Sequence, residues 1–134
     1  MADIDTLFEA ARAAQARAYV PYSRFKVGAA LLGADGRIYA GCNVENAAYP
    51  QGVCAEAAAL SAMVLAGGRR ATALLVLGEG PSWVTPCGGC RQKLREFADA
   101  QTPVLVADGS GVQLWFTLEQ LLPHSFGPEH LVRG

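Results

Sequence analysis

The chain has 134 residues, of which 51% are hydrophobic and 17% charged, and this composition suits one soluble domain with a continuous core. The formal net charge of -1 provides no basic field for phosphate groups, which argues against an extended nucleic-acid footprint. Residues 1–20 mix charged and apolar side chains, and no apolar run approaches the about 20 residues that span a bilayer. We therefore expect no signal peptide, no membrane anchor and a cytoplasmic location.

Residues 4–19 are predicted to form an amphipathic helix, because apolar side chains recur there at helical spacing. Thr6 and Glu9 have the spacing of a capping box, and Pro21 is expected to stop the helix. Later in the chain, apolar strand-forming runs alternate with helix-forming segments. The further elements expected are strands over 25–32, 37–40, 74–77, 104–107 and 112–116, and helices over 54–66, 88–98 and 117–122. This order predicts an α/β domain with one sheet of about five strands covered by helices.

Three of the four cysteines stand at the starts of two predicted helices. Cys54 begins one helix, with Glu56 two residues later, and Cys87 and Cys90 lie at the start of another. Helix N-termini present unpaired N–H groups and positive charge, which favour the thiolates that bind Zn²⁺. Three protein ligands leave one tetrahedral position for water, whose pKa zinc lowers toward about 7. A glutamate close to the first ligand, followed by Pro-Cys-x-x-Cys, is typical of zinc-dependent deaminases.

Other uses of the cysteines fit the sequence less well. Cys42 as a fourth ligand would close the site and make it structural, and a Cys-x-x-Cys pair alone also occurs in redox dithiols. A structural site leaves Glu56 unexplained, and a dithiol has no need of Cys54. Disulfides are typical of secreted mini-proteins, which nothing else in the sequence suggests. We therefore interpret Cys42 as a small buried hydrophobic residue.

Five ordered motifs, covering nearly the whole chain, resemble the cytidine deaminase family. They are Pro21-Tyr22-Ser23-Arg24-Phe25 with Val27-Gly28-Ala29-Ala30, then Gly41 to Tyr49, Cys54-Ala55-Glu56, Pro86 to Gln92, and Leu121-Leu122-Pro123 with Ser125-Phe126-Gly127. The resemblance implies a single domain over residues 1–134, built as a three-layer α/β/α sandwich with a mixed five-stranded sheet. It further implies a homotetramer with one zinc per subunit and active sites at subunit interfaces.

The reaction implied by the resemblance is hydrolytic deamination of cytidine and deoxycytidine, with release of ammonia, in pyrimidine salvage. Cys54, Cys87 and Cys90 would bind zinc, while Glu56 would pass a proton to N3 of the pyrimidine and assist departure of ammonia. The positions that match the family's substrate contacts are Phe25 for the base, Asn43 and Glu45 for the ribose, the Ala55 backbone for the pyrimidine ring, and Phe126 for a neighbouring subunit's pocket.

One position departs from the pattern of many family members. They have an arginine directly after the catalytic glutamate, and this chain has Ala57. Zinc with three thiolates carries a formal charge of -1, which makes the metal a poorer Lewis acid. We expect Arg91, together with the two helix dipoles, to offset that charge.

Alternatives within and outside this chemistry remain. Blasticidin-type deaminases share the zinc motifs, although Glu45 favours an ordinary nucleoside. Deaminases of polynucleotides need a basic groove, which the charge balance does not supply. A zinc-stabilised interaction module would bind the metal without turnover. His124 and His130 lie outside the metal motifs, and we expect them at the surface or an interface.

Overall fold

Helices and strands alternate along the chain in the predicted order. The computed structural model describes residues 3–131. The elements are α1 (Ile4–Gln15), β1 (Gly28–Gly33), β2 (Ile38–Cys42), the 3-10 turn η1 (Tyr49–Gln51), α2 (Ala55–Leu65), β3 (Ala71–Leu77), α3 (Gly88–Arg95), β4 (Pro103–Asp108), β5 (Gly111–Thr117), α4 (Leu118–Leu121) and the 3-10 turn η2 (Pro128–His130).

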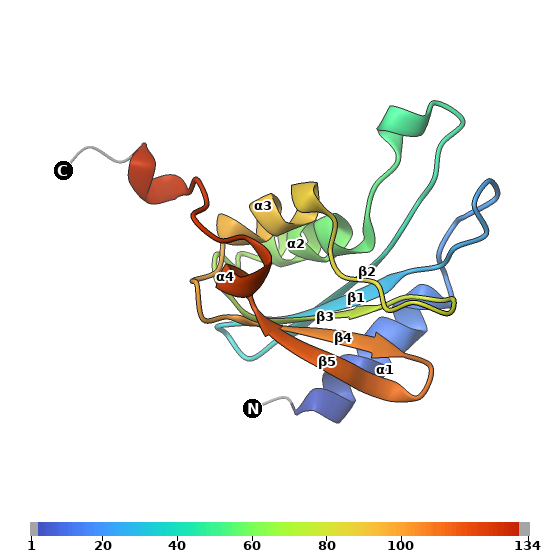
Figure 1. The fold of residues 1–134 in the computed structure, drawn as a ribbon, viewed down its shortest axis with the longest axis horizontal. Coiled ribbons are helices and arrows are strands. Elements are labelled where there is room, and N and C mark those ends of the chain that lie inside the picture. Colours follow the sequence, from blue (N-terminus) through green and yellow to red (C-terminus); the bar gives the residue numbers. More distant parts are fainter. Residues whose placement is uncertain (1–2, 132–134) are drawn as a thin grey trace.

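The strands form one five-stranded sheet in the order β2-β1-β3-β4-β5 (Figure 1). β1 pairs antiparallel with β2 and β3, and β4 pairs antiparallel with β5. β3 and β4 are parallel, so a crossover must join them, and α3 lies in that connection. The predicted mixed five-stranded sheet is confirmed.

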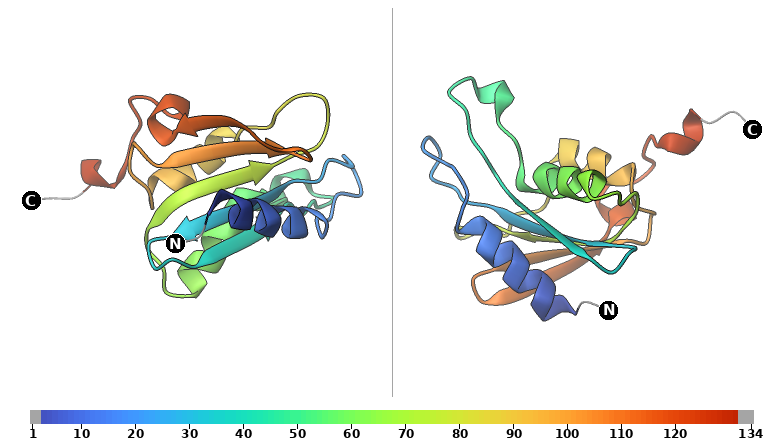
Figure 2. Two further views of the ribbon diagram at one scale, coloured as in Figure 1. Left: turned by 90° about the horizontal axis from the view of Figure 1, so that it is seen from below. Right: turned by 180° about the vertical axis from the view of Figure 1, so that it is seen from behind.

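Helices cover both faces of the sheet, and α1 lies opposite α2 and α3 (Figures 1 and 2). Side chains of β3 alternate between the two faces: Leu74 and Val76 belong to the core under α2 and α3, while Leu75 and Leu77 pack with Leu7 of α1. The predicted three-layer α/β/α architecture is therefore confirmed. Within residues 3–131, every helix falls short of the length and hydrophobicity that a bilayer span requires.

The first helix begins at Ile4, as predicted, but its end and its cap differ from the prediction. It ends at Gln15, because the backbone of Tyr19 bonds instead to the segment after β2, through Tyr19 N–H to Asn43 O at 3.0 Å and Glu45 N–H to Tyr19 O at 2.8 Å. The predicted capping box is wrong. Asp3 caps the helix by accepting from the Thr6 N–H at 2.8 Å.

Other boundaries also depend on contacts with distant residues. The helix predicted over 88–98 ends at Arg95, and the Phe97 carbonyl accepts from the Ala71 N–H at 2.8 Å, at the start of β3. The strand predicted over 25–32 begins only at Gly28. Just before it, Val27 donates to the side-chain Oδ1 of Asn43 at 2.9 Å and accepts from the Asn43 N–H at 3.2 Å. These contacts lie far apart in sequence, so local propensity could not reveal them.

A close contact brings α2 onto β2. A Cβ atom at Gly41 would lie 2.5 Å from the Ala55 carbonyl oxygen and 2.6 Å from the Ala59 nitrogen. Only glycine allows this approach, since real Cβ contacts are longer. Gly41 therefore fixes the position of the first turn of α2, which carries part of the candidate site.

Candidate active site

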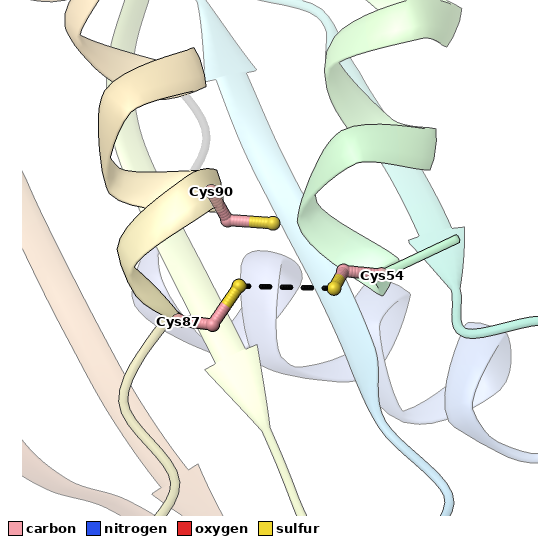
Figure 3. A group of neighbouring side chains, drawn as sticks. All are labelled: Cys54, Cys87 and Cys90. Atoms are coloured by element: carbon pink, nitrogen blue, oxygen red, sulfur yellow. Dashed lines mark hydrogen bonds between the residues drawn. The ribbon is translucent and has the colours of Figure 1, made fainter. Parts of the chain in front are cut away.

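Cysteine sulfurs meet where α2 and α3 begin side by side (Figure 3). Cys54 is the N-cap residue of α2, Cys87 is the N-cap residue of α3, and Cys90 lies in the first turn of α3. The three Sγ atoms lie within 4.8 Å of one another, and those of Cys54 and Cys87 are 3.8 Å apart. A tetrahedral ion with Zn–S bonds of about 2.3 Å requires sulfurs about 3.8 Å apart. The predicted convergence is confirmed, and the donor set fits zinc.

The environments of these thiols differ. Burial, followed by the negative charge of Glu56, raises the pKa of the Cys90 thiol well above its usual range. Burial would also raise the pKa of Cys87, but hydrogen bonds from the Cys90 backbone and from neighbouring sulfurs lower it overall. Because a metal ion binds thiolates, zinc binding at these cysteines would be coupled to the release of thiol protons.

Glu56 lies in the first turn of α2 and is only 5% exposed. Burial raises the pKa of its carboxyl group, and a hydrogen bond from its own backbone offsets part of that shift. A carboxyl group with a raised pKa exchanges protons more readily near neutral pH, which suits a general acid–base group.

A small pocket brings Glu56 together with the metal-binding residues. It has a volume of about 130 Å³, and its lining residues are Val27, Asn43, Cys54, Ala55, Glu56, Val84, Thr85 and Cys87. Small-molecule sites usually measure about 300–1,000 Å³, so this pocket is small for a whole ligand. Val27, Val84 and Thr85 were not predicted, because apolar and hydroxyl residues in loops carry no signal of their own in the sequence.

Asn43 links the pocket to the segment that carries Phe25. Its side-chain Oδ1 accepts from the Val27 N–H at 2.9 Å, and its Nδ2 donates to the Phe25 carbonyl at 2.9 Å. The amide therefore pairs with the backbone just before β1 in the manner of a neighbouring strand. Phe25 packs against the core beneath α2 and α3 and close to Gly78 and Gly80.

Glu45 holds the preceding loop. Its Oε1 accepts from the backbone N–H groups of Tyr22 at 2.9 Å and Ser23 at 3.1 Å, and its Oε2 accepts from the Ser23 hydroxyl. Hydrogen bonds from Ser23 and Tyr22 lower the pKa of Glu45 against the effect of burial, so the group is ionised. Glu45 lines a separate depression of about 380 Å³ with Tyr49. Ser23 was not singled out from the sequence, although it stands in the motif that ends at Phe25.

Phe126 lies outside both of these hollows. Its backbone carbonyl accepts from Gln92 Nε2 at 2.9 Å on α3, beyond the first turn with its cysteines, and its side chain is 56% exposed. The structure thus brings together Cys54, Cys87, Cys90, Ala55, Glu56 and Asn43, but not Glu45 or Phe126.

Arg91 lies beside the loop that leads into Cys87. Its guanidinium donates to the Pro86 carbonyl at 2.7 Å, the Thr85 hydroxyl at 2.9 Å and the Leu121 carbonyl at 2.8 Å. All three acceptors are neutral, and Arg91 takes part in none of the ion pairs among the described residues. Its positive charge is therefore not neutralised locally.

Ala57 faces a groove between α2 and α3. Cys42, at the end of β2, is not part of the cysteine cluster.

An α/β/α domain with three cysteine sulfurs and a buried glutamate at two helix N-termini has the architecture of a zinc-dependent deaminase. The family model for the cytidine and deoxycytidylate deaminase zinc-binding region matches residues 1–106. Cytidine deaminase from Sporosarcina psychrophila is 43% identical over 129 residues, which are 96% of this chain and 95% of that protein.

Solved structures agree with this match. The crystal structure of cytidine deaminase from Burkholderia pseudomallei has a TM-score of 0.86 and 41% identity, covering 93% of this chain and 100% of that chain. The corresponding structure from Mycobacterium tuberculosis has a TM-score of 0.80 and 42% identity, covering 95% of this chain and 99% of that chain. The chain therefore belongs to the cytidine deaminase family. The matched zinc-binding region contains Cys54, Cys87 and Cys90, so zinc is the metal that fits this site.

Proposed function

We propose that this chain catalyses the hydrolytic deamination of cytidine and deoxycytidine to uridine and deoxyuridine, with release of ammonia. The observation that carries the proposal is the burial of Glu56 in a pocket it shares with two sulfurs of the cysteine cluster. Membership of the cytidine deaminase family supports it, and the family's relatives match this chain over almost its full length.

The proposed chemistry divides between the metal and Glu56. Cys54, Cys87 and Cys90 would hold zinc, which would supply the Lewis acidity that makes water a nucleophile near neutral pH. The Glu56 carboxylate accepts the first proton of the attacking water and delivers it to N3. It then accepts the second proton from the hydroxyl group added at C4, as the C4 carbonyl forms, and passes it to the departing amino group, which leaves as ammonia. The Ala55 N–H, in the first turn of α2, has no intrahelical partner and so can donate to the pyrimidine ring.

The ribose and base contacts are assigned by the same reasoning. Asn43 and Glu45 offer donors and acceptors for a sugar hydroxyl, and Phe25 packs against the base. Both polar side chains already hold the Tyr22 to Val27 segment by hydrogen bonds. A carboxylate has about four lone-pair sites, so Glu45 can accept from a ribose hydroxyl without releasing that loop.

We propose that the chain is a single deaminase domain that assembles as a homotetramer with its active sites at subunit interfaces. The pocket is small for a nucleoside, and Phe126 lies away from it, so a neighbour is needed to complete the site. An apolar groove of about 730 Å³ runs between α2 and α3, and Leu65 beside it is 90% exposed. A helix that is apolar nearly all round is normally covered on every side, so a second copy is the expected occupant.

The reaction converts a free cytosine nucleoside to the uracil nucleoside, which is the chemistry of pyrimidine salvage, and we propose that it takes place in the cytoplasm. A small nucleoside is the expected partner, with no nucleic acid or membrane. The near-neutral charge balance supports this, because strand-binding deaminases need a basic groove.

The deciding experiment is cytidine turnover by the purified chain, followed as formation of both uridine and ammonia, with the zinc content measured in the same sample. We expect turnover with about one zinc per chain, lost on chelation and restored by added zinc. Stoichiometric zinc without turnover of cytidine or deoxycytidine would overturn the proposal and favour another aminopyrimidine substrate or a structural metal site.

A further inference from the structure

We infer that Arg95 is a positioning residue for Phe126, because it fixes the C-terminal segment Ser125–His130 against the last turn of α3. The inference rests on the proposed function, in which the Phe126 ring enters the pocket of a neighbouring subunit. It assigns a task to a half-buried arginine that the metal and substrate contacts leave unused.

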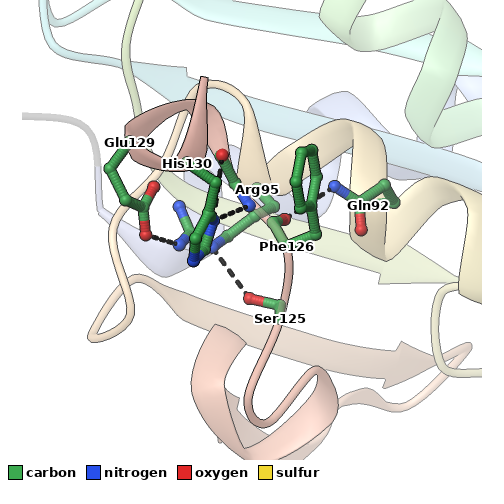
Figure 4. A network of polar contacts seen from close by, with 7 residues as sticks. Gln92, Arg95, Ser125, Phe126, Glu129 and His130 are labelled. Carbon is green, nitrogen blue, oxygen red and sulfur yellow. Dashed lines mark hydrogen bonds and ion pairs between the residues drawn. The ribbon is translucent and has the colours of Figure 1, made fainter. Parts of the chain in front are cut away.

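Contacts on both sides of Phe126 hold this segment (Figure 4). Arg95 Nε donates to the Ser125 hydroxyl at 2.8 Å, and Arg95 Nη2 forms an ion pair with the Glu129 carboxylate. Between these two contacts, Gln92 Nε2 donates to the Phe126 carbonyl at 2.9 Å. The segment is thus held at the Ser125 and Glu129 side chains on either side of Phe126 and at the Phe126 backbone itself.

The Arg95 guanidinium is packed as well as hydrogen-bonded. Its side chain is 19% exposed, and a Cβ atom at Gly127 would lie 2.3 Å from its Cζ atom. Glycine at 127 therefore lets the planar guanidinium lie directly against the backbone. The hydrogen bond from Arg95 lowers the pKa of Glu129, so the pair stays ionised at neutral pH. A planar fork with several donors can make these contacts together, whereas a lysine ammonium cannot lie flat in the same space.

The aromatic ring is fixed within the segment itself. The rings of Phe126 and His130 stack with centroids 5.1 Å apart and an interplanar angle of 17°. His130 Nδ1 accepts from the Gly127 N–H at 2.9 Å, and the Phe126 side chain remains 56% exposed. An exposed ring that is already ordered loses less conformational entropy when it packs against a ligand.

The same helix connects this segment to the candidate metal site. Cys87 and Cys90 lie at the beginning of α3, and Arg95 is its last residue. Arg95 therefore follows Cys90 by less than two helical turns. A helix of this length is rigid, so the position of Phe126 is coupled to the position of the metal ligands. Arg95 therefore sets where the ring is presented, without touching a substrate itself.

The test compares Arg95→Ala, Arg95→Lys, Phe126→Ala and the double variant Arg95→Ala/Phe126→Ala. We expect Arg95→Ala to raise KM for cytidine by about 2- to 10-fold with little change in kcat, since ordering of a side chain costs an amount of that size. The double variant should match Phe126→Ala, because Arg95 acts through Phe126. Arg95→Lys should fall between wild type and Arg95→Ala. Arg70→Ala is the matched control, because Arg70 forms an exposed ion pair with Asp99 in another part of the molecule, and its KM should equal that of wild type.

Hydrogen–deuterium exchange gives a readout independent of turnover. The amides of Gly127, His130 and Leu131 are hydrogen-bonded in this segment, and they should exchange faster in Arg95→Ala than in wild type. Unchanged exchange, an unchanged KM, or effects of Arg95→Ala and Phe126→Ala that simply multiply would each overturn the inference. Loss of zinc or of the oligomer in both Arg95 variants would also overturn it, because the role would then be structural. Absence of turnover in the zinc-loaded wild type would instead defeat the proposed function.

Discussion

At the residue scale, the same side chain serves the fold and the proposed chemistry. Asn43 and Glu45 satisfy backbone N–H groups in the Tyr22 to Val27 segment. The proposed function also assigns them to the ribose. Glu56 differs from them, because it is buried beside three cysteines without a structural ion pair among the described residues. Burying a carboxyl group costs free energy. Such groups are concentrated at functional sites, where the shifted pKa serves the chemistry. Its surroundings therefore point to chemistry more directly than those of the other predicted residues.

Replacement of Glu56 tests that role. Glu56→Gln should retain about one zinc per chain and lower kcat by a factor of about 10² to 10⁴, because a positioned acid–base group contributes that much. Metal analysis and steady-state kinetics on the same sample check both parts. Glu9→Gln, on the exposed side of α1, is the matched control and should keep wild-type activity. Near-normal turnover by Glu56→Gln would remove this residue from the proposed mechanism.

Arg91 is expected to offset the negative charge of three thiolates, where Ala57 supplies none. The Arg91 guanidinium donates to the carbonyl of Pro86, the residue before Cys87. Arg91→Ala removes this positive charge, so the pH–rate profile should move to higher pH, or the zinc content should fall. Arg91→Lys keeps the charge and should show the smaller change. If the profile and the zinc content of Arg91→Ala both equal those of wild type, helix dipoles alone are sufficient.

At the element scale, close packing and turn contacts fix the geometry around the site. Gly41 allows α2 to approach β2, and the start of α2 then stands beside the start of α3. The turn between β1 and β2 is held by Asp35, whose carboxylate accepts from the Tyr39 hydroxyl at 2.6 Å and the Arg37 N–H at 2.9 Å. Strand pairing at this edge of the sheet therefore depends in part on one ionised carboxylate.

The Asp35 carboxylate gives the stability a defined pH dependence. Hydrogen bonds, first from Tyr39 and then from Arg37, lower the pKa of Asp35 in the folded state. Its contribution is therefore complete above the unfolded pKa of about 3.9 and is lost as the pH falls through the lower folded value. Asp35→Asn should be less stable than wild type at pH 7 in urea unfolding, and the difference should narrow below about pH 4. Tyr39→Phe should also be less stable than wild type at pH 7, by a difference that narrows below about pH 4. A stability difference that stays constant with pH would contradict this account.

At the scale of the whole molecule, the described residues form one five-stranded sheet and a small pocket beside the candidate metal site. The pocket of about 130 Å³ lacks an aromatic wall, and Phe126 is exposed beyond the first turn of α3. An interface across a symmetry axis would place that ring against another copy, because symmetric assemblies repeat the same contact in every subunit. In the proposed homotetramer, activity would be a property of the assembly.

Mixed oligomers test for shared sites. Subunits with Glu56→Gln and subunits with Phe126→Ala, unfolded and refolded together in equal amounts, should form about a quarter of their sites with both residues intact. Those sites should combine the wild-type kcat with the wild-type KM, a combination that neither variant shows when refolded alone. Activity equal to the simple average of the two separate variants would mean that each site belongs to one subunit.

The sequence by itself determined the order of elements, the layered α/β class and the convergence of Cys54, Cys87 and Cys90 with Glu56. The elements are recognised from local periodicity, whereas the convergence is recognised because the cysteine motifs together have the spacing of a zinc-dependent deaminase. Only the tertiary structure decided that α1 ends at Gln15, that Asn43 takes the place of a strand before Gly28, and that Arg95 holds the segment around Phe126. Each of these features depends on a contact between residues that are distant in the chain. Packing, rather than local propensity, decides which partner a backbone or charged group bonds to.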